Sequence, residues 1–421
     1  MRVSSASGSV RESNQRVLVI TPIFPLRQQP YRGQANYQIV RALQTLTEVE
    51  VICILARYPD WFPPTFDYRL SDPTFCPPDV ATHYVEYPAI PGFTRWFNGA
   101  VCANYAEPLA RALRPSVILN FWLYPEGYGS VLVGRRLGVP VIVGSIGSDL
   151  NRIADPISRF LTRHTLKRAD FAITKSRHLR QQAIRLGASP KKVRAILNGC
   201  DTTVFKPLDR LSARKELGIR EEGKHVVYVG RLDSKKGTGE LLEAVAPLAH
   251  SGSTRLTFVG DGPAEPMLQK RAVELGIAQW VRFEPACSSV KVANWIASSN
   301  VLSLPSHAEG CPSAIIEALS CGRPVVASDV GGIPEILTKD CGALVPPGDV
   351  GALTLALQGV LRRAWDEQEI AQRFRRGWDQ VAKEIFEVCC GVTDKPTGGE
   401  IGRSKLLSAA RLKSGAEALA P

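Results

Sequence analysis

PSHAEGCPSAIIEALSCGRPVVASDVGGIPEIL, at Pro305–Leu337, is the stretch of sequence that decides the fold. A short apolar run at Asn300–Pro305 leads into it and ends in a turn that contains Gly and Pro. A helical pattern follows at Ser313–Leu319, and a second apolar run lies at Pro324–Ser328. A strand, a helix and another strand in this order predict a βαβ unit, in which both strands lie parallel in one sheet.

The same alternation of apolar runs and helical patterns continues on both sides of this unit. In the second half of the chain, further runs lie at His225–Gly230, Arg255–Gly260 and Val281–Glu284. In the first half they lie at Arg16–Phe24, Val49–Leu55, Val117–Phe121, Val139–Gly144, Phe171–Thr174 and Val193–Leu197. Few charges interrupt these runs, as buried parallel strands require. By contrast, Tyr58–Pro91 is crowded with Pro and aromatic residues, which predicts a long irregular loop.

The length of 421 residues exceeds what one hydrophobic core usually serves, so two domains are expected. Turn residues at 198–201 and a hinge-like Phe205-Lys206-Pro207 separate the two series of strands. We therefore predict an α/β fold with two Rossmann-like, doubly wound parallel-sheet domains that face each other across a cleft. The predicted parts are a disordered N-terminus (1–15), an N-terminal domain (16–200), a C-terminal domain (207–370), a helix that crosses back (371–390) and a mobile tail (391–421).

The composition is that of a globular protein, with 44% hydrophobic and 22% charged residues. No run approaches the roughly 20 apolar residues that span a bilayer, and the polar N-terminus lacks the apolar core of a signal peptide. We therefore expect a cytoplasmic location. The ten cysteines are scattered without zinc-like spacing, so we interpret them as reduced, small hydrophobic residues.

The net charge of +12 is unevenly distributed. Between Asn151 and Arg194 the chain is rich in Lys and Arg, and only Asp155 and Asp170 oppose them. Such a segment is either a solvated basic face, a surface that attracts an acidic substrate, or one that docks on anionic lipid at the inner face of the cytoplasmic membrane. Nucleic acid is not expected as a partner, because no helix-turn-helix, zinc-finger or RNP-type signature is present.

Two carboxylates accompany the predicted helix at Ser313. Glu309 lies in the loop before the helix, and Glu317 lies one turn inside it. The first amides of a helix have no intrahelical partner and form an anion site. Carboxylates beside that site can accept hydrogen bonds from the vicinal hydroxyls of a sugar. The alternative for Glu317 is a purely electrostatic interaction with its own helix.

Two cations follow the first predicted strand of the second domain. Arg231 and Lys236 lie in the loop that leaves this strand, at the mouth of the predicted cleft. Cations in that place suit a diphosphate leaving group, whose negative charge grows in the transition state. The alternative is that both are ordinary surface cations.

These motifs together resemble the retaining glycosyltransferases of the GT-B fold, the group that includes glycosyltransferase family 4. The matching segments are VGRLDSKKG at Val229–Gly237, VGDGP at Val259–Pro263, and the opening stretch, in which Glu309 and Glu317 have the spacing of the EX7E motif. Asn198-Gly199-Cys200-Asp201 is similar to the NGVD segment at the interdomain hinge of the family.

The resemblance implies a role for each matching residue. Arg231 and Lys236 would bind the donor diphosphate, Glu309 would hold hydroxyls of the donor sugar near the reacting carbon, and Glu317 would bind the nucleotide ribose. On the N-terminal side, Gly33 would let the backbone approach the phosphates, and Asp149 would face the sugar or the acceptor. The backbone of the loop and the helix start would assist at Gly310, Cys311, Pro312, Ser313 and Ala314.

The resemblance also implies the reaction: transfer of a sugar, with retention, from a nucleotide diphosphate-sugar co-substrate to a glycan or a lipid-linked acceptor, as in exopolysaccharide or cell-envelope synthesis. No Asp-x-Asp motif is present, so we expect neither a metal nor another cofactor. No carboxylate nucleophile is evident, which favours a front-face displacement. The sequence departs from the family at Cys311, where a bulky apolar residue is usual, and at Gln34, where many members have a second Gly.

Other functions that use Rossmann units fit less well. Gly260-Asp261-Gly262-Pro263 begins like a dinucleotide fingerprint, but Glu265 stands where the third Gly is required. No Walker A motif is present, which excludes a P-loop NTPase. A non-catalytic subunit that binds a sugar nucleotide or a glycan, and a sugar-nucleotide epimerase of the same architecture, remain open alternatives.

Overall fold

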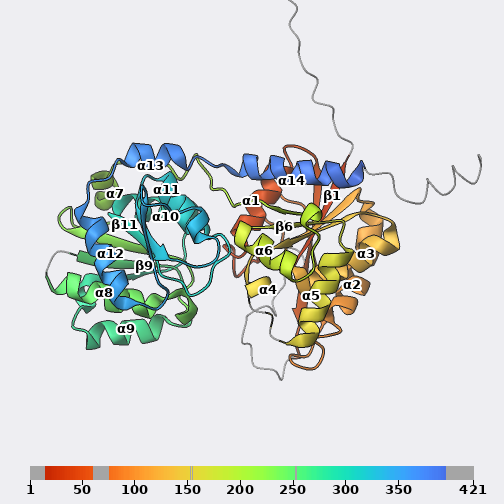
Figure 1. Cartoon of the computed structure of the whole chain (residues 1–421), viewed down its shortest axis with the longest axis horizontal. Coiled ribbons are helices and arrows are strands. Elements are labelled where there is room, and N and C mark those ends of the chain that lie inside the picture. The colour runs from red at the N-terminus through yellow and green to blue at the C-terminus, as the bar shows by residue number, and fades with distance from the viewer. Residues whose placement is uncertain (1–14, 60–74, 152, 154, 252–253, 395–421) are drawn as a thin grey trace, which may run out of the picture.

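The computed structural model describes residues 15–59, 75–151, 153, 155–251 and 254–394. Within them the chain forms two α/β domains, each built on one parallel sheet (Figure 1). The sheets have seven and six strands, in the orders β3-β2-β1-β4-β5-β6-β7 and β10-β9-β8-β11-β12-β13. Among the described residues, all strand pairs within the two sheets are parallel, which confirms the predicted fold class.

The N-terminal sheet contains the predicted strands and one that the sequence did not predict. Its strands are β1 (Arg16–Thr21), β2 (Glu48–Arg57), β3 (Thr82–Pro88), β4 (Val117–Asn120), β5 (Val141–Ser145), β6 (Phe171–Thr174) and β7 (Val193–Ala195). Its helices are α1 (Gln34–Leu43), α2 (Asn98–Leu113), α3 (Tyr128–Leu137), α4 (Ser148–Asn151), α5 (Pro156–Arg168) and α6 (Arg177–Arg185). The prediction of an irregular loop over Tyr58–Pro91 was wrong for its last part, because β3 pairs with β2 along its whole length; residues 60–74 lie outside the described residues.

The C-terminal sheet follows the same plan. Its strands are β8 (Lys224–Val229), β9 (Thr254–Val259), β10 (Val281–Glu284), β11 (Val301–Leu304), β12 (Val325–Ser328) and β13 (Gly342–Val345). Its helices are α7 (Arg210–Glu216), α8 (Thr238–His250), α9 (Glu265–Glu274), α10 (Ser289–Ser298), α11 (Ser313–Ser320), α12 (Val350–Arg362) and α13 (Glu367–Arg373). The unpredicted β13 closes the edge beside β12.

Alternation along the buried strands gives each domain three layers, because successive side chains of a strand point to opposite faces. In β1, Val17 and Val19 pack into a core that also contains residues of α1. Leu18 and Ile20 belong to a second core, which includes residues of α2, α3, α5 and α6. Helices thus cover both faces of the sheet, as the continuous apolar character of the strands requires. Across the described helices, none combines the length and the apolar composition that crossing a membrane requires.

The chain returns from the second domain to the first through α14 (Trp378–Thr393), which lies along the N-terminal domain at the top of Figure 1. Val381, Ile385 and Cys389 of this helix pack into the core that contains α1 and one face of β1. The sequence predicted one late helix around residues 366–388, and this was wrong. Two helices, α13 and α14, flank Arg376 and Gly377, whose backbones contact Cys200 at the hinge. Of the predicted termini, residues 1–14 and 395–421 lie outside the described residues.

Candidate active site

The strand order of the C-terminal sheet reverses between β8 and β11, and ligands of such sheets bind at the carboxyl ends of the strands at this point. The loops that follow both strands press against each other there. Gly237 has a φ of 67°, and a Cβ at this position would lie 2.0 Å from the backbone oxygen of Pro305. Only Gly fits, and the contact brings the loop that carries Arg231 and Lys236 beside the loop that carries Glu309.

Three of the predicted site residues meet in this place. The Nζ atom of Lys236 lies 2.7 Å from Oε1 of Glu309, and the Glu309 side chain is 9% exposed against 33% for Lys236. Together with Arg231 they line a cleft of about 760 Å³. Ile146, Ser148 and Asn151 line the same cleft from the N-terminal domain. Lys235 and Asp233 line it as well, so three cations and two carboxylates gather between the two domains.

The two domains approach each other closely at a contact between glycines. Gly310 follows Glu309, and a Cβ on it would lie 2.3 Å from the backbone oxygen of Ile146. Gly147 has a φ of 126°, and its Cβ would lie 3.0 Å from Cα of Gly310. On the other side, a Cβ on Gly332 would lie 2.1 Å from the Gly310 oxygen. Gly310 therefore sets the width of the cleft through its missing side chain, and its backbone contact with the donor stays a prediction.

The first residues of α11 lie at the same seam. Pro312, Ser313 and Ala314 are half-buried, whereas Cys311 is buried. Asn198, in the hinge segment, donates from its side-chain Nδ2 to the backbone oxygen of Cys311 over 3.0 Å. Its backbone N–H donates to the Cys311 sulfur over 3.4 Å. Burial raises the pKa of the Cys311 thiol to about 11, so the thiol is neutral at physiological pH. Cys311 thus joins the hinge to the helix start, and it does not line the cleft.

Glu317 lies further along α11 and is half-buried. Within the described residues, its carboxylate forms no hydrogen bond or ion pair, and burial raises its pKa to about 7. Its charge is therefore costly in the folded protein until a donor group reaches it. The structure does not place Glu317 among the residues that line the cleft with Lys236 and Glu309.

Asp149, predicted to face the sugar or the acceptor, is tied into its own domain by three hydrogen bonds. Its Oδ1 accepts hydrogen bonds from Ser145 Oγ (2.8 Å) and from the amide of Gly147 (3.0 Å), and its Oδ2 accepts from the amide of Leu123 (3.1 Å). Burial raises the pKa of this carboxyl. Its neighbours Ser148 and Asn151 line the cleft instead. Asp149 therefore holds the loop after β5 in shape and is not among the residues that line the cleft; its role toward the sugar or the acceptor stays a prediction.

Gly33 likewise serves the fold of its own loop. It precedes α1 with a φ of 68°, and a Cβ would lie 2.7 Å from the backbone oxygen of Ile23. The side chain of Asn36 donates to the same oxygen over 3.0 Å. The space that a side chain would need is occupied by the protein itself, and Gly33 does not line the cleft.

A second pocket, which the sequence did not predict, lies at the reversal point of the N-terminal sheet between β1 and β4. We call it the switch-point pocket; it has about 310 Å³ and is lined by Ile23, Arg32, Tyr87, Trp122, Tyr124 and Glu126, among others. Glu126 is 5% exposed, its Oε2 has no hydrogen-bond partner within the described residues, and burial raises its pKa to about 8. A carboxylate after a strand that ends at this point was the signal in the sequence that could have identified it.

A charge-assisted contact between the domains also escaped the sequence analysis. The two oxygens of Glu335 accept hydrogen bonds from the amides of Arg177 and His178, each over 2.8 Å. These amides open α6 in the N-terminal domain, where a negative charge is favoured. Glu335 comes from the C-terminal domain and therefore joins the two domains near the cleft.

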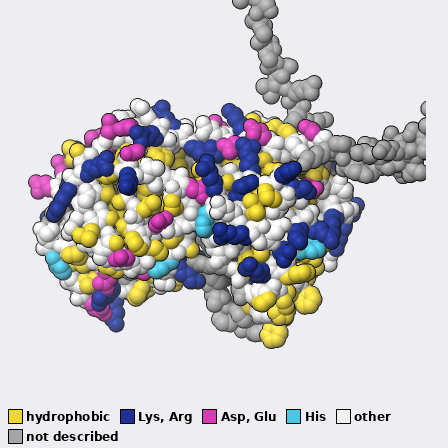
Figure 2. Space-filling view, viewed as in Figure 1, with side chains coloured by type: hydrophobic (Ala, Val, Ile, Leu, Met, Phe, Trp, Pro, Cys, Tyr) yellow, Lys and Arg dark blue, Asp and Glu magenta, His cyan; other side chains and the backbone are white. Residues whose placement is uncertain are grey.

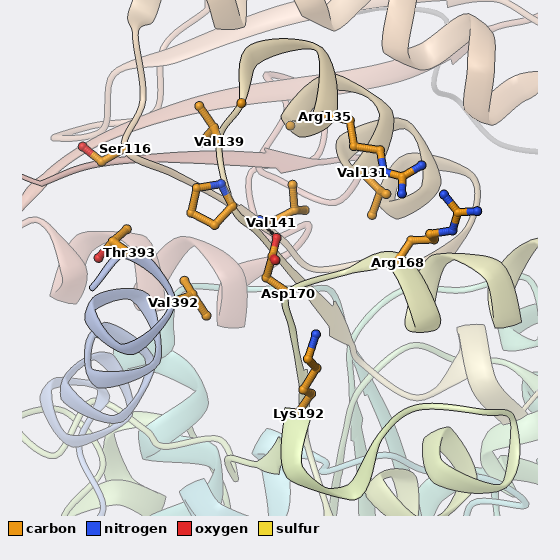
Figure 3. A pocket seen from close by; sticks show the side chains of 13 residues that line it. Ser116, Val131, Arg135, Val139, Val141, Arg168, Asp170, Lys192, Val392 and Thr393 are labelled. Atoms are coloured by element: carbon orange, nitrogen blue, oxygen red, sulfur yellow. Dashed lines mark hydrogen bonds between the residues drawn. The ribbon is translucent and has the colours of Figure 1, made fainter. Parts of the chain in front are cut away.

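A further cavity of about 570 Å³ lies at the other end of the N-terminal sheet, where its strands begin (Figure 3). Arg135 and Arg168 lie at one end of it and Thr393 at the other. Arg135 is in the last turn of α3 and Arg168 in the last turn of α5, where cations offset the negative helix ends. Asp170 accepts a hydrogen bond from the amide of Val141 over 2.9 Å. These groups are accounted for by the fold, so we do not assign the active site to this cavity.

Comparison with known proteins gives the same result for both halves of the chain. Residues 33–199 match the model of the glycosyl transferase 4-like domain, and residues 209–377 match that of the glycosyl transferases group 1. A D-inositol 3-phosphate glycosyltransferase of Thermomonospora curvata is 32% identical over 65% of this chain and 71% of its own. TuaC of Bacillus subtilis, named provisionally as a teichuronic acid biosynthesis glycosyltransferase, is 28% identical over 81% of this chain and 88% of its own.

Solved structures share the two-domain fold. Alr3699/HepE of Anabaena, solved in complex with UDP-glucose, superimposes with a TM-score of 0.68 at 18% identity, over 90% of this chain and all of that one. Sucrose-phosphate synthase of Thermosynechococcus elongatus gives 0.67 at 21% identity, over 94% of this chain and all of that one. With the two parallel sheets, these matches establish the GT-B fold. The chain belongs to the group 1, family 4-like glycosyltransferases.

Proposed function

We propose that this glycosyltransferase moves a sugar from a nucleotide diphosphate-sugar to a glycan or a lipid-linked acceptor, with retention at the anomeric carbon. The observation that carries the proposal is the meeting of Arg231, Lys236 and Glu309 on one cleft between the two domains. Cations beside a carboxylate match the two parts of such a donor, because the diphosphate needs positive charge and the sugar hydroxyls need acceptors.

The chemistry follows from where charge develops. As the bond between the anomeric carbon and the diphosphate oxygen breaks, negative charge grows on the leaving group beside Arg231 and Lys236. An acceptor hydroxyl approaches from the same face, forms the new bond to carbon and gives its proton to a leaving phosphate oxygen. The pairing of Lys236 with Glu309 keeps the amine near the carboxylate that would hold the sugar. The first amides of α11 add to the positive potential.

The likeness to other proteins supports the choice of donor and the place in metabolism. Neighbouring structures of Alr3699/HepE contain UDP or UDP-glucose, which supports a nucleotide-sugar donor here. The TuaC relative supports a role in polysaccharide or cell-envelope synthesis. We propose that the switch-point pocket receives the acceptor. It lies at the carboxyl ends of the strands of the N-terminal sheet, and Ile146 and Ser148, which line the cleft, lie at these same ends. The basic segment 151–194 would place the enzyme at the inner face of the cytoplasmic membrane.

The direct test is a turnover assay in which nucleotide-sugars are offered with lipid extract or oligosaccharide, and NMR identifies the anomer formed. The proposal expects release of nucleoside diphosphate and a product with the donor's anomeric configuration. An inverted product would contradict the front-face displacement. Donor binding without release of nucleoside diphosphate would favour a non-catalytic binding subunit, and conversion of the donor sugar to its epimer would favour the epimerase.

A further inference from the structure

Exposed hydrophobic side chains gather on the N-terminal domain where the segment before α2 meets the start of α5. Phe93 is 79% exposed, Phe97 66% and Phe160 64%. Trp96 and Ile157 complete the set, which we call the aromatic rim. Figure 2 shows hydrophobic side chains at the lower end of this domain, with Lys and Arg side chains above them. A contiguous group of exposed large apolar side chains indicates an interaction surface.

The rim is held in an outward-facing position by hydrogen bonds. Trp96 Nε1 donates to Asp155 Oδ1 over 3.1 Å, and Arg95 Nε donates to Ser158 Oγ over 3.1 Å. Asp155 also caps α5, because its Oδ1 accepts from the amide of Ser158 over 2.7 Å. The two segments are therefore tied together, and the exposure of their aromatic side chains is a feature of the folded domain.

A stripe of positive charge runs beside the rim along α5. Arg159, Arg163 and Lys167 are each four residues apart, so they lie on one side of the helix, and all are exposed. The helix contains no acidic residue. Among the described residues, none forms an ion pair with these three cations. We call these three residues the basic stripe. Cations next to exposed aromatic side chains match an anionic lipid surface, which offers phosphates above an apolar layer.

An apolar groove connects the rim with the switch-point pocket. The groove has about 720 Å³, and its walls include Tyr58, Tyr87, Ile90, Thr94, Val101 and Tyr105. Thr94 adjoins Phe93 of the rim. Tyr58 and Tyr87 also line the switch-point pocket, so the two hollows are neighbours. A molecule with a polar head in the pocket could lay an apolar tail along the groove toward the rim.

We propose that the aromatic rim and the basic stripe dock on an anionic lipid bilayer, so that the groove and the switch-point pocket open to an amphiphilic acceptor in that bilayer. This inference rests on the proposed function, because the pocket is taken to receive the acceptor. A protein partner would need neither the uninterrupted positive charge of α5 nor the apolar groove that leads inward.

The test is co-sedimentation of the full chain with vesicles of phosphatidylcholine, with and without phosphatidylglycerol. We expect binding to the anionic vesicles that weakens as salt is raised. Replacing Arg159, Arg163 and Lys167 together by Gln lowers affinity by roughly a hundredfold. Replacing Phe93, Phe97 and Phe160 together by Ala lowers it by about tenfold or more.

Matched variants come from the C-terminal domain. Val273, Val290 and Leu355 are 68%, 61% and 69% exposed, and their joint replacement by Ser leaves vesicle binding unchanged. Joint replacement of the exposed Lys215, Lys270 and Lys339 by Gln removes the same charge and has at most a small effect. Unchanged melting temperatures show that all variants fold.

Three outcomes would overturn the inference. The first is that the wild type does not bind anionic vesicles. The second is that the matched variants lose as much vesicle affinity as the rim and stripe variants. The third is that the protein forms a dimer, which rim variants convert to monomer, while vesicle binding is absent. Melting shifts with nucleotide-sugars separate this from the proposed function. A wild type that shifts with donor but ignores vesicles refutes the docking alone, and one that binds vesicles but no nucleotide-sugar refutes the proposed function alone.

Discussion

At the scale of the residue, the two carboxylates near the start of α11 have very different surroundings. Glu309 has a cation within hydrogen-bond distance, whereas Glu317 is half-buried without any ion pair among the described residues. Burial disfavours the charged form of a carboxyl, and an adjacent cation favours it. Glu317 therefore has a raised pKa of about 7, which makes it sensitive to pH in the physiological range.

The first prediction concerns the replacement of Glu317 by Gln. The folded state holds a proton on Glu317 up to about pH 7, whereas the unfolded chain releases it near 4.5, so this residue destabilises the fold as pH rises through that range. E317Q removes this cost. The free energy of unfolding of E317Q minus that of wild type should be about 1–3 kcal/mol larger at pH 8 than at pH 5.

Denaturant titrations at both pH values check this prediction. The same series tests the ribose role, because a deprotonated Glu317 accepts hydroxyl hydrogen bonds better. Donor affinity of the wild type should rise as pH increases through 7, and that of E317Q should stay flat. An equal stability difference at pH 5 and pH 8 would show that the carboxyl is not perturbed by burial.

The positions of site residues could be predicted where chemistry and spacing coincide. Arg231, Lys236 and Glu309 each follow a strand at a point where adjacent strands end, so their meeting could be inferred from the order of the strands. Asp149 and Gly33 could not be placed in the same way. Their positions depend on hydrogen bonds and close backbone contacts within one loop, such as Leu123 with Asp149, and these leave no periodic signal.

At the scale of the element, the buried central strands were predicted well, and the edges were not. β8 and β11 are mostly apolar and mostly buried, because both faces of each strand are covered. β3 lies at an edge and carries mostly half-buried residues, and its sequence, THYVEYP, therefore lacks that run. The break between α13 and α14 at Gly377 depends on a contact with the hinge at Cys200, which the helical periodicity does not report.

The second prediction concerns the glycine contact that spaces the two domains. In Gly310→Ala, the new Cβ meets the Ile146 oxygen at 2.3 Å and must push the loops apart. A displacement near 1 Å lowers kcat/KM by roughly a hundredfold. Gly359→Ala in α12 is the matched control, since nothing lies within 4 Å of its Cβ. Steady-state kinetics of the two variants check the prediction, and full activity in G310A would contradict it.

The third prediction concerns the return helix α14. Ile385 is fully buried against the N-terminal domain, so Ile385→Ala leaves a cavity and costs about 2–5 kcal/mol of unfolding free energy. Lys383 lies two residues before Ile385, on the exposed side of the helix. Lys383→Ala should change the free energy of unfolding by less than about 0.5 kcal/mol. Denaturant unfolding followed by circular dichroism measures both. Equal losses would mean that α14 is not part of the N-terminal core.

At the scale of the whole molecule, the cleft exists only while the domains keep their relative position. The hinge at Asn198 and Cys200, the glycine contact at Gly310 and the carboxylate of Glu335 all join the two halves. Glu335 is the contact whose removal does least to either core, because its side chain bonds to exposed amides at the start of α6.

The fourth prediction follows from this contact. Glu335→Ala removes two charge-assisted hydrogen bonds, each about 1.5–3 kcal/mol before solvent screening, so the domains should separate more often. Small-angle scattering should give a larger radius of gyration for E335A than for wild type. Glu274→Ala, on the outer helix α9, should leave it unchanged. An identical scattering curve for E335A and wild type would mean that the other contacts alone fix the domains.

The central claim, that a nucleotide-sugar binds in the cleft at Arg231 and Lys236, is tested most directly by thermal melts. Wild type and Arg231→Ala are melted with UDP-, GDP-, ADP-, dTDP- and CMP-sugars, and with NAD for comparison. Ligand at about a hundred times its Kd adds roughly 2.7 kcal/mol, which shifts the melting temperature by several degrees. We predict a shift for the wild type with one class of nucleotide-sugar, a smaller shift for R231A and none with NAD. A shift with NAD, no shift with any nucleotide-sugar, or an undiminished shift in R231A would contradict the account.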